Sequence, residues 1–295
     1  MSNAALMLVR SEPEDSSSLP VEAMFRFLGT DVRVVSASVE LLHRWTDSYG
    51  AFRIQPGPAQ ITVRVHGEED AAPSPGQVTI ESGGLRRAWQ GRSTVLPPLA
   101  TPPLDRWTYL HGAAVGRAGH AVLILGGARV GKTLLALSIV ARGARLLADG
   151  LLPLDPGDLL LAPFPEALRL RREELASLGT DPAHPALVPF RTSSGSIEWR
   201  ADPVGLLASR AGGAAAGAVT AVVFLQEPSS DEPRLDPLPP GQALQWVRRH
   251  LHRPAPDAER TQKVLARLCQ AIPAFALTAG PPDWTARLCD EALLA

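Results

Sequence analysis

The sequence has few lysines and few cysteines. Only two of its 29 basic residues are lysines, Lys132 and Lys263, which indicates a general bias toward arginine and draws attention to each lysine that is present. The two cysteines, Cys269 and Cys289, are too few for a disulfide framework or a cysteine-rich metal site. We expect both to be half-buried helical thiols.

The chain also lacks a net charge and long apolar runs. Lys plus Arg number 29 against 30 for Asp plus Glu, so no excess of cations favours sequence-independent nucleic-acid binding. The apolar run at 6–9 is too short for a secretory signal, and the longest uncharged apolar stretch, 211–226, is shorter than the roughly 20 residues of a spanning helix. We therefore expect a soluble, cytoplasmic protein with neither nucleic-acid nor membrane partners.

A length of 295 residues with 45% hydrophobic residues predicts a folded protein of about two domains. Residues 96–107 contain four prolines, which oppose regular pairing and helix interiors, so this segment is expected to connect a domain at 1–103 to one at 104–295. The first domain is predicted to be β-rich, with one helix at 39–45. Its expected strands are at 31–38, 60–67 and 77–82, the last followed by a hairpin at Gly83-Gly84.

The second domain begins with a strand–loop–helix–strand pattern. The continuous apolar run 121–125 is typical of a strand buried on both faces, and a helix at 133–143 and a returning strand at 144–149 follow it. Further along, the patterns predict a buried strand at 218–225, a Pro- and acid-rich loop at 226–241, and two closing helices at 242–251 and 257–272. This order of elements indicates the α/β (α+β) class.

The loop between the first strand and helix of this pattern carries a motif with specific chemistry. It fits the phosphate-binding pattern G-x-x-x-x-G-K-[ST] and consists of Gly126, Gly127, Ala128, Arg129, Val130, Gly131, Lys132 and Thr133. Glycines let successive backbone N–H groups point at one phosphate, and the following helix adds the positive end of its dipole. The lysine reaches the β- and γ-phosphates, and the threonine hydroxyl is a ligand for Mg²⁺. The motif therefore predicts a nucleotide site.

The residues on either side of this loop suggest a family. Leu110-His111-Gly112 precedes the loop, and Leu147-Ala148-Asp149-Gly150 follows the loop helix. Here the chain resembles the HPr serine kinase/phosphatase family, which has a histidine in an HG-type strand before the loop and an aspartate pair in the strand after it. The resemblance covers about 110–155 and continues more weakly through 168–179 and 218–225. It implies a P-loop kinase domain of the HPr kinase/phosphoenolpyruvate carboxykinase type, with a small β-rich N-terminal domain.

The resemblance also implies roles for individual residues. Lys132 and the loop amides would hold the phosphates of ATP, and Thr133 and Asp149 would hold Mg²⁺. Asp149 matches the family's general base for the acceptor hydroxyl, and His111 matches the histidine beside that base. From the residues alone, an ordinary half-buried strand histidine is the favoured interpretation of His111. For Asp149 a functional role is favoured, and a cap of the turn into Gly150 is the alternative.

Two departures from the family pattern affect these roles. The second aspartate of the pair is Gly150 here, and the family's RGLG-type signature, which supplies another Mg²⁺ ligand, is not recognisable. Asp155, Glu166 and Glu198 are the candidates for a replacement ligand. Arg169, Arg171 and Arg172 lie in a segment with helical character, and these three and Arg129 are open between a phosphate contact and a solvated surface. A basic cluster is open between a site for an acidic partner segment and a surface helix end: Arg248, Arg249, His250, His252 and Arg253.

The function favoured by these patterns is transfer of the ATP γ-phosphoryl group to a hydroxyl of a peptide, protein or small molecule, with Lys132, Asp149 and His111 as catalytic residues. A nucleotide-binding scaffold or partner protein that has lost catalysis is the main alternative, and Gly150 favours it. An ATPase switch ranks last because no water-positioning residue is recognisable. The resembled family forms hexamers, so a homo-oligomer is considered, but no pattern in this chain indicates one.

Overall fold

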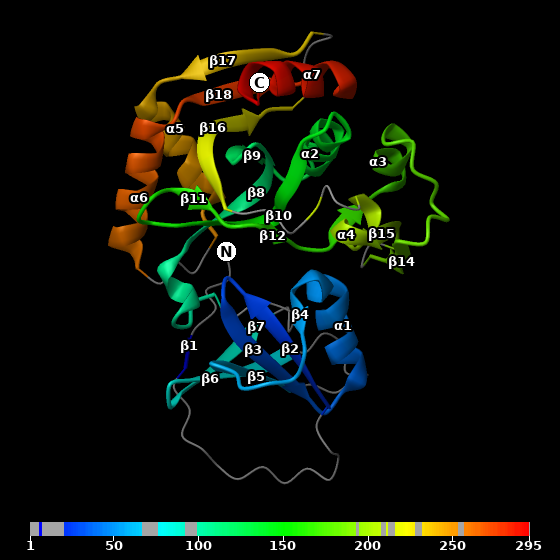
Figure 1. Ribbon diagram of the computed structural model, residues 1–295, viewed down its shortest axis with the longest axis vertical. Helices are drawn as coiled ribbons and strands as arrows, with labels where there is room; N and C mark the ends of the chain where they lie inside the picture. Colours follow the sequence, from blue (N-terminus) through cyan, green and yellow to red (C-terminus); the bar gives the residue numbers. More distant parts are fainter. Residues whose placement is uncertain are drawn as a thin grey trace. The chain divides into compact units, whose positions relative to one another are not determined.

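The computed structural model describes residues 6–7, 21–66, 76–91, 99–192, 195–207, 211, 216–227, 232–252 and 257–294. The chain divides into two compact units, Met1–Asp105 and Arg106–Ala295, and both combine sheets with helices (Figure 1). The predicted mixed α/β class is therefore confirmed. The specific P-loop kinase type stays a prediction, as do the roles of the two predicted domains.

The N-terminal unit is one sheet with a helix packed on it. The sheet has the strand order β1-β7-β6-β5-β3-β2-β4, in which only β3 and β5 pair in parallel. Its elements are β1 (Leu6–Met7), β2 (Val21–Phe27), β3 (Thr30–Ser36), α1 (Val39–Tyr49), a 3-10 turn (Gly50–Phe52), β4 (Arg53–Ile54), β5 (Ile61–His66), β6 (Gly76–Ser82), β7 (Leu85–Gly91) and a second 3-10 turn (Leu104–Arg106).

Aromatic side chains fix α1 to this sheet. Phe25 and Phe27 on β2 are fully buried, as is Trp45 on α1, and the rings of Phe25 and Trp45 lie 5.8 Å apart. Rings of this size bury large apolar areas and so contribute strongly to a small core. The three predicted strands, the helix and the hairpin at Gly83-Gly84 are all present, although α1 extends four residues beyond its predicted end at residue 45.

The C-terminal unit is built on a larger sheet with the strand order β11-β10-β8-β9-β16-β18-β17, and a separate small sheet has the order β13-β15-β14. Its strands are β8 (Thr108–Arg117), β9 (His120–Gly126), β10 (Arg145–Leu154), β11 (Leu160–Leu161), β12 (Phe164–Pro165), β13 (Leu168–Leu170), β14 (Leu187–Arg191), β15 (Ile197–Ala201), β16 (Gly217–Leu225), β17 (Arg234–Leu238) and β18 (Ala274–Thr278). Its helices are α2 (Lys132–Ala141), α3 (Arg172–Ser177), α4 (Pro203–Leu207), α5 (Pro240–Val247), the 3-10 helix η4 (Arg248–His250), α6 (Ala258–Ala271) and α7 (Pro282–Leu293).

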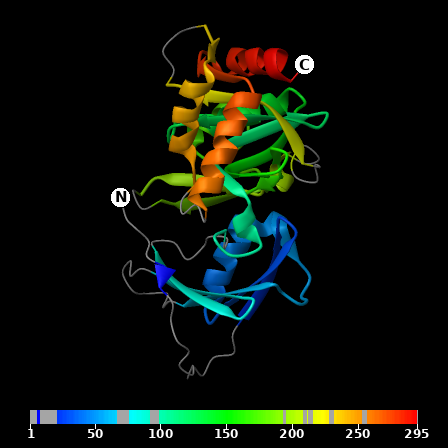
Figure 2. The same cartoon turned by 90° about the vertical axis from the view of Figure 1, so that its left-hand side faces the viewer.

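Helices cover both faces of the larger sheet. Helices α2 and α7 pack together on one face, and α5 and α6 lie side by side on the other (Figures 1 and 2). The central strands β9 and β16 are parallel and end together, with Gly126 paired to Leu225. Because both faces are covered, these strands are continuous apolar runs, as predicted. Ligands of such sheets bind beyond the carboxyl ends of the strands, which is where the phosphate-binding motif begins.

Three predictions for this unit were wrong. The stretch 226–241 was expected to be a loop, but 234–238 form the edge strand β17, where Pro237 is tolerated because one side of the strand has no partner. The segment that carries Arg169, Arg171 and Arg172 was expected to have helical character, but 168–170 form β13 and the helix begins at Arg172. A further strand and helix, β18 and α7, follow the two helices that were expected to close the chain. Cys269 and Cys289 are helical free thiols as predicted, and both are fully rather than half buried.

None of the helices in the described ranges has the length and apolar character needed to cross a membrane.

A single carboxylate, Asp290, ties α7 to the rest of its unit. Its Oδ1 accepts a hydrogen bond of 2.7 Å from the Arg117 guanidinium, and its Oδ2 lies 3.6 Å from Arg142 Nε. Arg117 ends β8 and Arg142 follows α2, so one side chain joins three elements. The Asp290 side chain is only 12% exposed, which strengthens these contacts relative to surface ion pairs.

We expect Asp290→Ala to lower the free energy of unfolding by about 2–3 kcal/mol, because it leaves two arginines without their shared partner. The adjacent Glu291→Ala is a matched control, since Glu291 forms only an exposed i,i+4 pair with Arg287. It should cost less than about 0.5 kcal/mol. Denaturant unfolding of both variants measures the difference, and equal losses would contradict the linking role of Asp290.

Candidate functional site

The predicted phosphate loop joins β9 to α2. Gly131 precedes α2 with φ of 102°, a left-handed conformation that favours glycine, and no side chain caps the helix. Arg129 also has a positive φ, 64°, and its side chain is exposed. An uncapped helix start leaves N–H groups available to an anion. The loop thus combines a left-handed glycine with a helix start that no side chain caps.

Lys132 is held across its own loop. Its Nζ donates hydrogen bonds to the carbonyl oxygens of Gly127 at 2.7 Å and Gly126 at 3.2 Å. Burial lowers the pKa of Lys132, and the nearby Asp149 carboxylate opposes this. The ammonium group thus lies at the loop, with a carboxylate close by.

Asp149 contacts the residue that follows Lys132. The Thr133 hydroxyl lies 3.0 Å from each of the two Asp149 carboxylate oxygens and donates to them. The strand register explains this proximity: Ala113 on β8 pairs with both Ile124 and Asp149, so Asp149 is level with the end of β9. Residues separated by 16 positions in the sequence therefore meet beside the loop.

The space beside Gly150 is occupied by a second carboxylate. A Cβ atom at Gly150 would lie 2.9 Å from Glu166 Oε2, and Gly150 has a φ of 97° that side chains rarely adopt. Glu166 follows β12, whose Pro165 pairs with Asp149. Of the three candidates for a replacement acid, Glu166 is thus the one next to Asp149. Glycine at 150 leaves room for it.

Burial shifts both of these carboxyl groups. It raises the pKa of Asp149 to about 7, an effect that the Thr133 hydrogen bond and Lys132 oppose and that Glu174 increases. It raises the pKa of Glu166 to about 8, where the Asp149 charge adds to the effect and Arg169 opposes it. Both carboxyls therefore retain protons near neutral pH in the protein without ligand.

His111 lies on the strand between Asp149 and the loop. It pairs with Leu151 across β8 and β10, and it is exposed although its neighbours on β8 are buried. The imidazole ring is still partly buried, and this lowers the pKa of His111, as does the charge of Lys132. A backbone hydrogen bond with Gly150 raises the pKa. The structure thus brings together the three residues that the sequence analysis proposed as catalytic: His111, Lys132 and Asp149.

The other two candidate acids have contacts elsewhere. The Asp155 carboxylate accepts a 2.6 Å hydrogen bond from the Gly157 amide within a turn. Glu198 lies on β15, where its charge adds to the Glu174 hydrogen bond that chiefly raises the pKa of Arg171. Neither contact involves Asp149.

The arginines of 168–172 also differ from one another. Arg171 pairs with Glu174 at 3.0 Å, and the Arg172 guanidinium lies over the Trp199 ring at 5.6 Å. Of these three arginines, Arg169 is the one whose positive charge opposes the rise in the pKa of Glu166.

The sequence analysis did not connect His250 and His252 with the site. Leu251 forms an isolated bridge to Leu110, and the His252 amide donates to the Tyr109 carbonyl at 2.9 Å. The segment therefore runs beside β8 at His111. Burial, together with the positive charges of Lys132, His111 and Arg249, lowers the pKa of His250 to about 4. The sequence shows the basic cluster but contains no signal for this long-range pairing.

The oxygen atoms at Thr133 and Asp149 fit a magnesium ion. Mg²⁺ prefers hard oxygen ligands, and in nucleotide sites it takes one or two from the protein and the rest from phosphates and water. No group of three or more His, Cys, Asp or Glu side chains in the described ranges is arranged to hold a metal by itself. An ion here would therefore depend on the nucleotide for part of its coordination.

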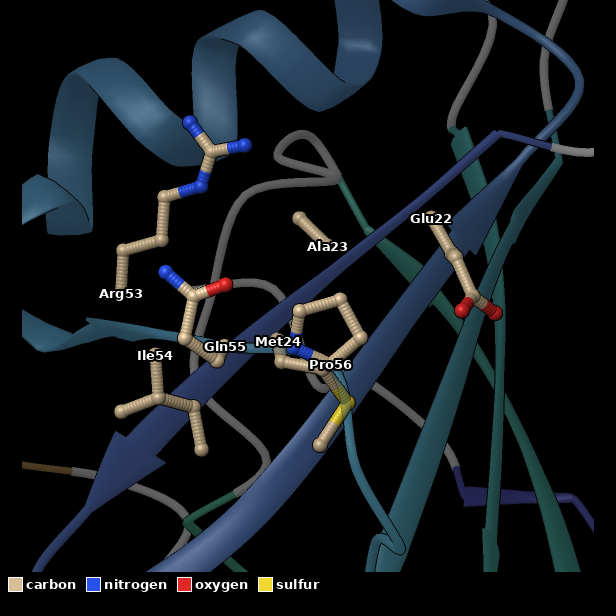
Figure 3. Close-up of a pocket in the computed structure, with 7 residues that line it drawn as sticks. All are labelled: Glu22, Ala23, Met24, Arg53, Ile54, Gln55 and Pro56. Carbon is tan, nitrogen blue, oxygen red and sulfur yellow. The ribbon is translucent and has the colours of Figure 1, made fainter.

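The N-terminal unit has a separate pocket of about 590 Å³ (Figure 3). It lies at the sheet edge formed by β2 and β4, and none of its lining residues is a candidate from the sequence. These residues are Glu22, Ala23, Met24, Arg53, Ile54, Gln55 and Pro56.

No family model and no curated protein matches the chain. Among solved structures, the HPr(Ser) kinase/phosphatase from Coxiella burnetii is similar at 15% sequence identity, with 62% of this chain and 88% of that chain covered and a TM-score of 0.31. A TM-score this low carries no argument about activity. We therefore base the proposed function on the distances and contacts within this chain.

The shifted groups predict how stability depends on pH. Raised carboxyl pKa values mean that the folded protein binds protons more tightly than the unfolded chain, so stability falls as pH rises toward the folded-state values of about 7 and about 8. The lowered histidine pKa values act in the opposite direction, but only below the ordinary value of 6.5.

We therefore expect the melting temperature of the metal-free protein to fall by a few degrees between about pH 6.5 and about pH 8. Glu166→Gln should remove much of this fall, whereas Glu198→Gln should leave it unchanged. Calorimetric melts across this range measure it. A wild-type melting temperature that stays constant or rises would show that the two carboxyls are not buried as described.

Proposed function

We propose that this protein is a Mg²⁺-dependent kinase that transfers the γ-phosphoryl group of ATP to a hydroxyl group. The contact between Thr133 and the Asp149 carboxylate, next to an uncapped glycine-rich loop, is the observation that carries the proposal. It places a hydroxyl, a carboxylate and a lysine around one point at the start of α2. Phosphoryl transfer requires these groups, since its catalysis consists mainly of positioning and charge neutralisation.

Lys132 and the loop amides bind the nucleotide phosphates in this proposal. In the structure Lys132 Nζ is hydrogen-bonded to the loop carbonyls of Gly126 and Gly127. Triphosphate oxygens replace these two acceptors with charged ones, and hydrogen bonds between charged partners are about twice as strong as neutral ones. The ammonium group neutralises charge that develops on the transferred phosphoryl group.

Thr133, Asp149 and Glu166 hold the magnesium ion. The ion supplies further charge neutralisation at the phosphates. Glu166 takes the part of the aspartate that Gly150 lacks, because its carboxylate lies where a side chain of residue 150 would begin. Loss of the carboxyl protons accompanies metal binding, since a protonated carboxyl is a poor ligand.

Asp149 accepts the proton of the acceptor hydroxyl. A general base must lie within hydrogen-bond reach of the proton it takes, and the Asp149 carboxylate lies beside the Thr133 hydroxyl at the start of α2. His111, on the adjacent strand, is available to orient the acceptor as a neutral imidazole, because its pKa is lowered by burial and by Lys132.

A nucleotide-binding protein without catalysis is the second candidate. Gly150 favours it, because it removes one acidic side chain from the position next to Asp149. The two functions differ in one observable: both require Mg·ATP binding, but only the kinase transfers the phosphoryl group to an acceptor. ATP hydrolysis without any acceptor would instead support the nucleotide switch.

Mg·ATP binding is expected to depend on one of the two lysines. Lys132→Ala should weaken it by about 10- to 100-fold, the loss expected when hydrogen bonds to a charged group are removed. Lys263→Ala is the matched control, because Lys263 is exposed on α6 and pairs with Glu259 at 2.7 Å. Calorimetric titration compares both with wild type. Absence of binding to folded wild-type protein would refute both the kinase and the nucleotide-binding candidates.

The choice of Glu166 among the three acids is tested by the Mg²⁺ requirement. Glu166→Gln should raise the Mg²⁺ concentration needed for half-maximal ATP binding by at least about tenfold. Asp155→Asn and Glu198→Gln should leave it unchanged, because neither side chain contacts the Asp149 cluster. Nucleotide binding titrated against Mg²⁺ provides the measurement, and an effect of Glu198→Gln as large as that of Glu166→Gln would show that the ligand was misassigned.

A further inference from the structure

The segment that joins α5 to α6 lies directly beside the candidate site. Leu251 bridges to Leu110, the residue before His111, and the His252 amide is hydrogen-bonded to the Tyr109 carbonyl at 2.9 Å. His250 and His252 flank Leu251 in sequence. This pairing fixes both histidines along the same stretch of β8 that carries His111.

A second contact places His250 toward the phosphate loop. Its ring lies 6.2 Å from the ring of Phe224, which packs edge-on against Trp246 at 5.4 Å. Phe224 immediately precedes Leu225, the partner of Gly126 at the start of the loop. His250 is therefore held between β8 and the end of β16, on the side where the loop begins.

These residues bring two positive side chains, Lys132 and Arg249, close to His250. Lys132, His111 and Arg249 all act on His250, and His111 acts on His252. No carboxylate contributes to the pKa shift of either histidine. Within the described ranges, Arg249, His250 and His252 form no ion pair with an acidic side chain, and Arg249 is exposed. The Asp149 carboxyl lies near Lys132, whereas no acidic side chain in the described ranges pairs with Arg249.

We propose that Arg249, His250 and His252 bind an acidic group of the phosphoryl acceptor, so that the acceptor carries a carboxylate or phosphate close to its reactive hydroxyl. The inference rests on the proposed kinase function and names the acceptor class for that site. Guanidinium and imidazole N–H groups donate well to such anions, and the guanidinium of Arg249 supplies a positive charge to them.

The nucleotide has its own binding groups, namely the loop amides and Lys132. The cluster of Arg249, His250 and His252 lies instead on the side of His111 and β8. Asp149, the proposed base, pairs with Ala113 of that strand, two residues from His111. An acceptor hydroxyl at Asp149 thus brings its neighbouring groups toward this cluster.

Binding of acidic and basic probes to the protein saturated with Mg²⁺ and a non-hydrolysable ATP analogue tests the inference. The probes are a short serine peptide flanked by aspartates, the same peptide flanked by lysines, and the small molecules glycerate and glycerol. Calorimetry with probes up to about 10 mM detects millimolar affinities. We expect the aspartate peptide or glycerate, or both, to bind at least about tenfold more tightly than its basic or neutral counterpart. The two acidic probes distinguish a peptide acceptor from a small hydroxy acid.

Three variants assign the binding to the cluster. The double variant with Arg249→Gln and His250→Gln should weaken acidic-probe binding at least about tenfold, with the affinity for the ATP analogue retained. Arg249→Glu changes an exposed side chain, so this variant should fold even if the double variant does not. It replaces the positive charge at 249 with a negative one and should reverse the preference between the two peptides. Arg191→Gln, at an exposed arginine on β14, should leave all affinities as in wild type.

Several outcomes would overturn the inference. These are binding of neither acidic probe, equal binding of acidic and basic peptides, or full acidic-probe binding in the variants of Arg249. Weakened binding of the ATP analogue with unchanged acidic-probe binding would also overturn it, because the cluster would then serve the nucleotide. Failure of wild type to bind the ATP analogue is a different result, since it refutes the proposed function itself.

Discussion

The hydroxyl of Thr133 and the carboxylate of Asp149 join the start of α2 to the middle of β10. The rest of the candidate site depends on this contact, because it fixes β10, which carries Asp149, relative to the loop before Lys132. The sheet makes it possible: β8 separates β9 from β10, and its register holds Asp149 level with the end of β9. The groups proposed to hold a magnesium ion and a triphosphate therefore lie within one small region.

Burying two carboxyl groups close together in this region costs free energy. Two carboxyls, Asp149 and Glu166, are buried near each other, and their pKa values rise to about 7 and about 8. A cation relieves this cost, since it favours both charged forms. Glycine at 150 is part of the same arrangement, because a side chain there would collide with Glu166. Gly150, at the position where the resembled family has its second aspartate, therefore leaves the space that the Glu166 carboxyl occupies.

The sequence predicts the parts of this fold that depend on local patterns. Alternating and continuous apolar runs located β3, β5, β9 and β16, and the glycines and lysine of the loop identified the turn into α2. It does not predict β17, because prolines at 237 and 239 are typical of loops and only pairing with β18 makes 234–238 a strand. It also misassigns 168–170, whose strand depends on pairing with β15. In both cases a partner distant in sequence decides the conformation.

The same limit applies to the site. Lys132 and Thr133 follow from a contiguous motif, and Asp149 and His111 follow from a resemblance in the flanking strands. The choice of Glu166 over Asp155 and Glu198 needs the position of β12 beside β10. The approach of His250 to His111 needs the bridge between Leu251 and Leu110. Neither is encoded at short range, so neither is visible in sequence spacing.

A crystal structure of the protein with Mg²⁺ and a non-hydrolysable ATP analogue tests the central claim most directly. The account predicts that Lys132 leaves the loop carbonyls for the β- and γ-phosphates. It also predicts that the ion lies about 2.1 Å from the Thr133 hydroxyl, with Asp149 and Glu166 as its other protein ligands. A nucleotide bound elsewhere, or one bound here with Lys132 still on Gly126 and Gly127, would contradict it.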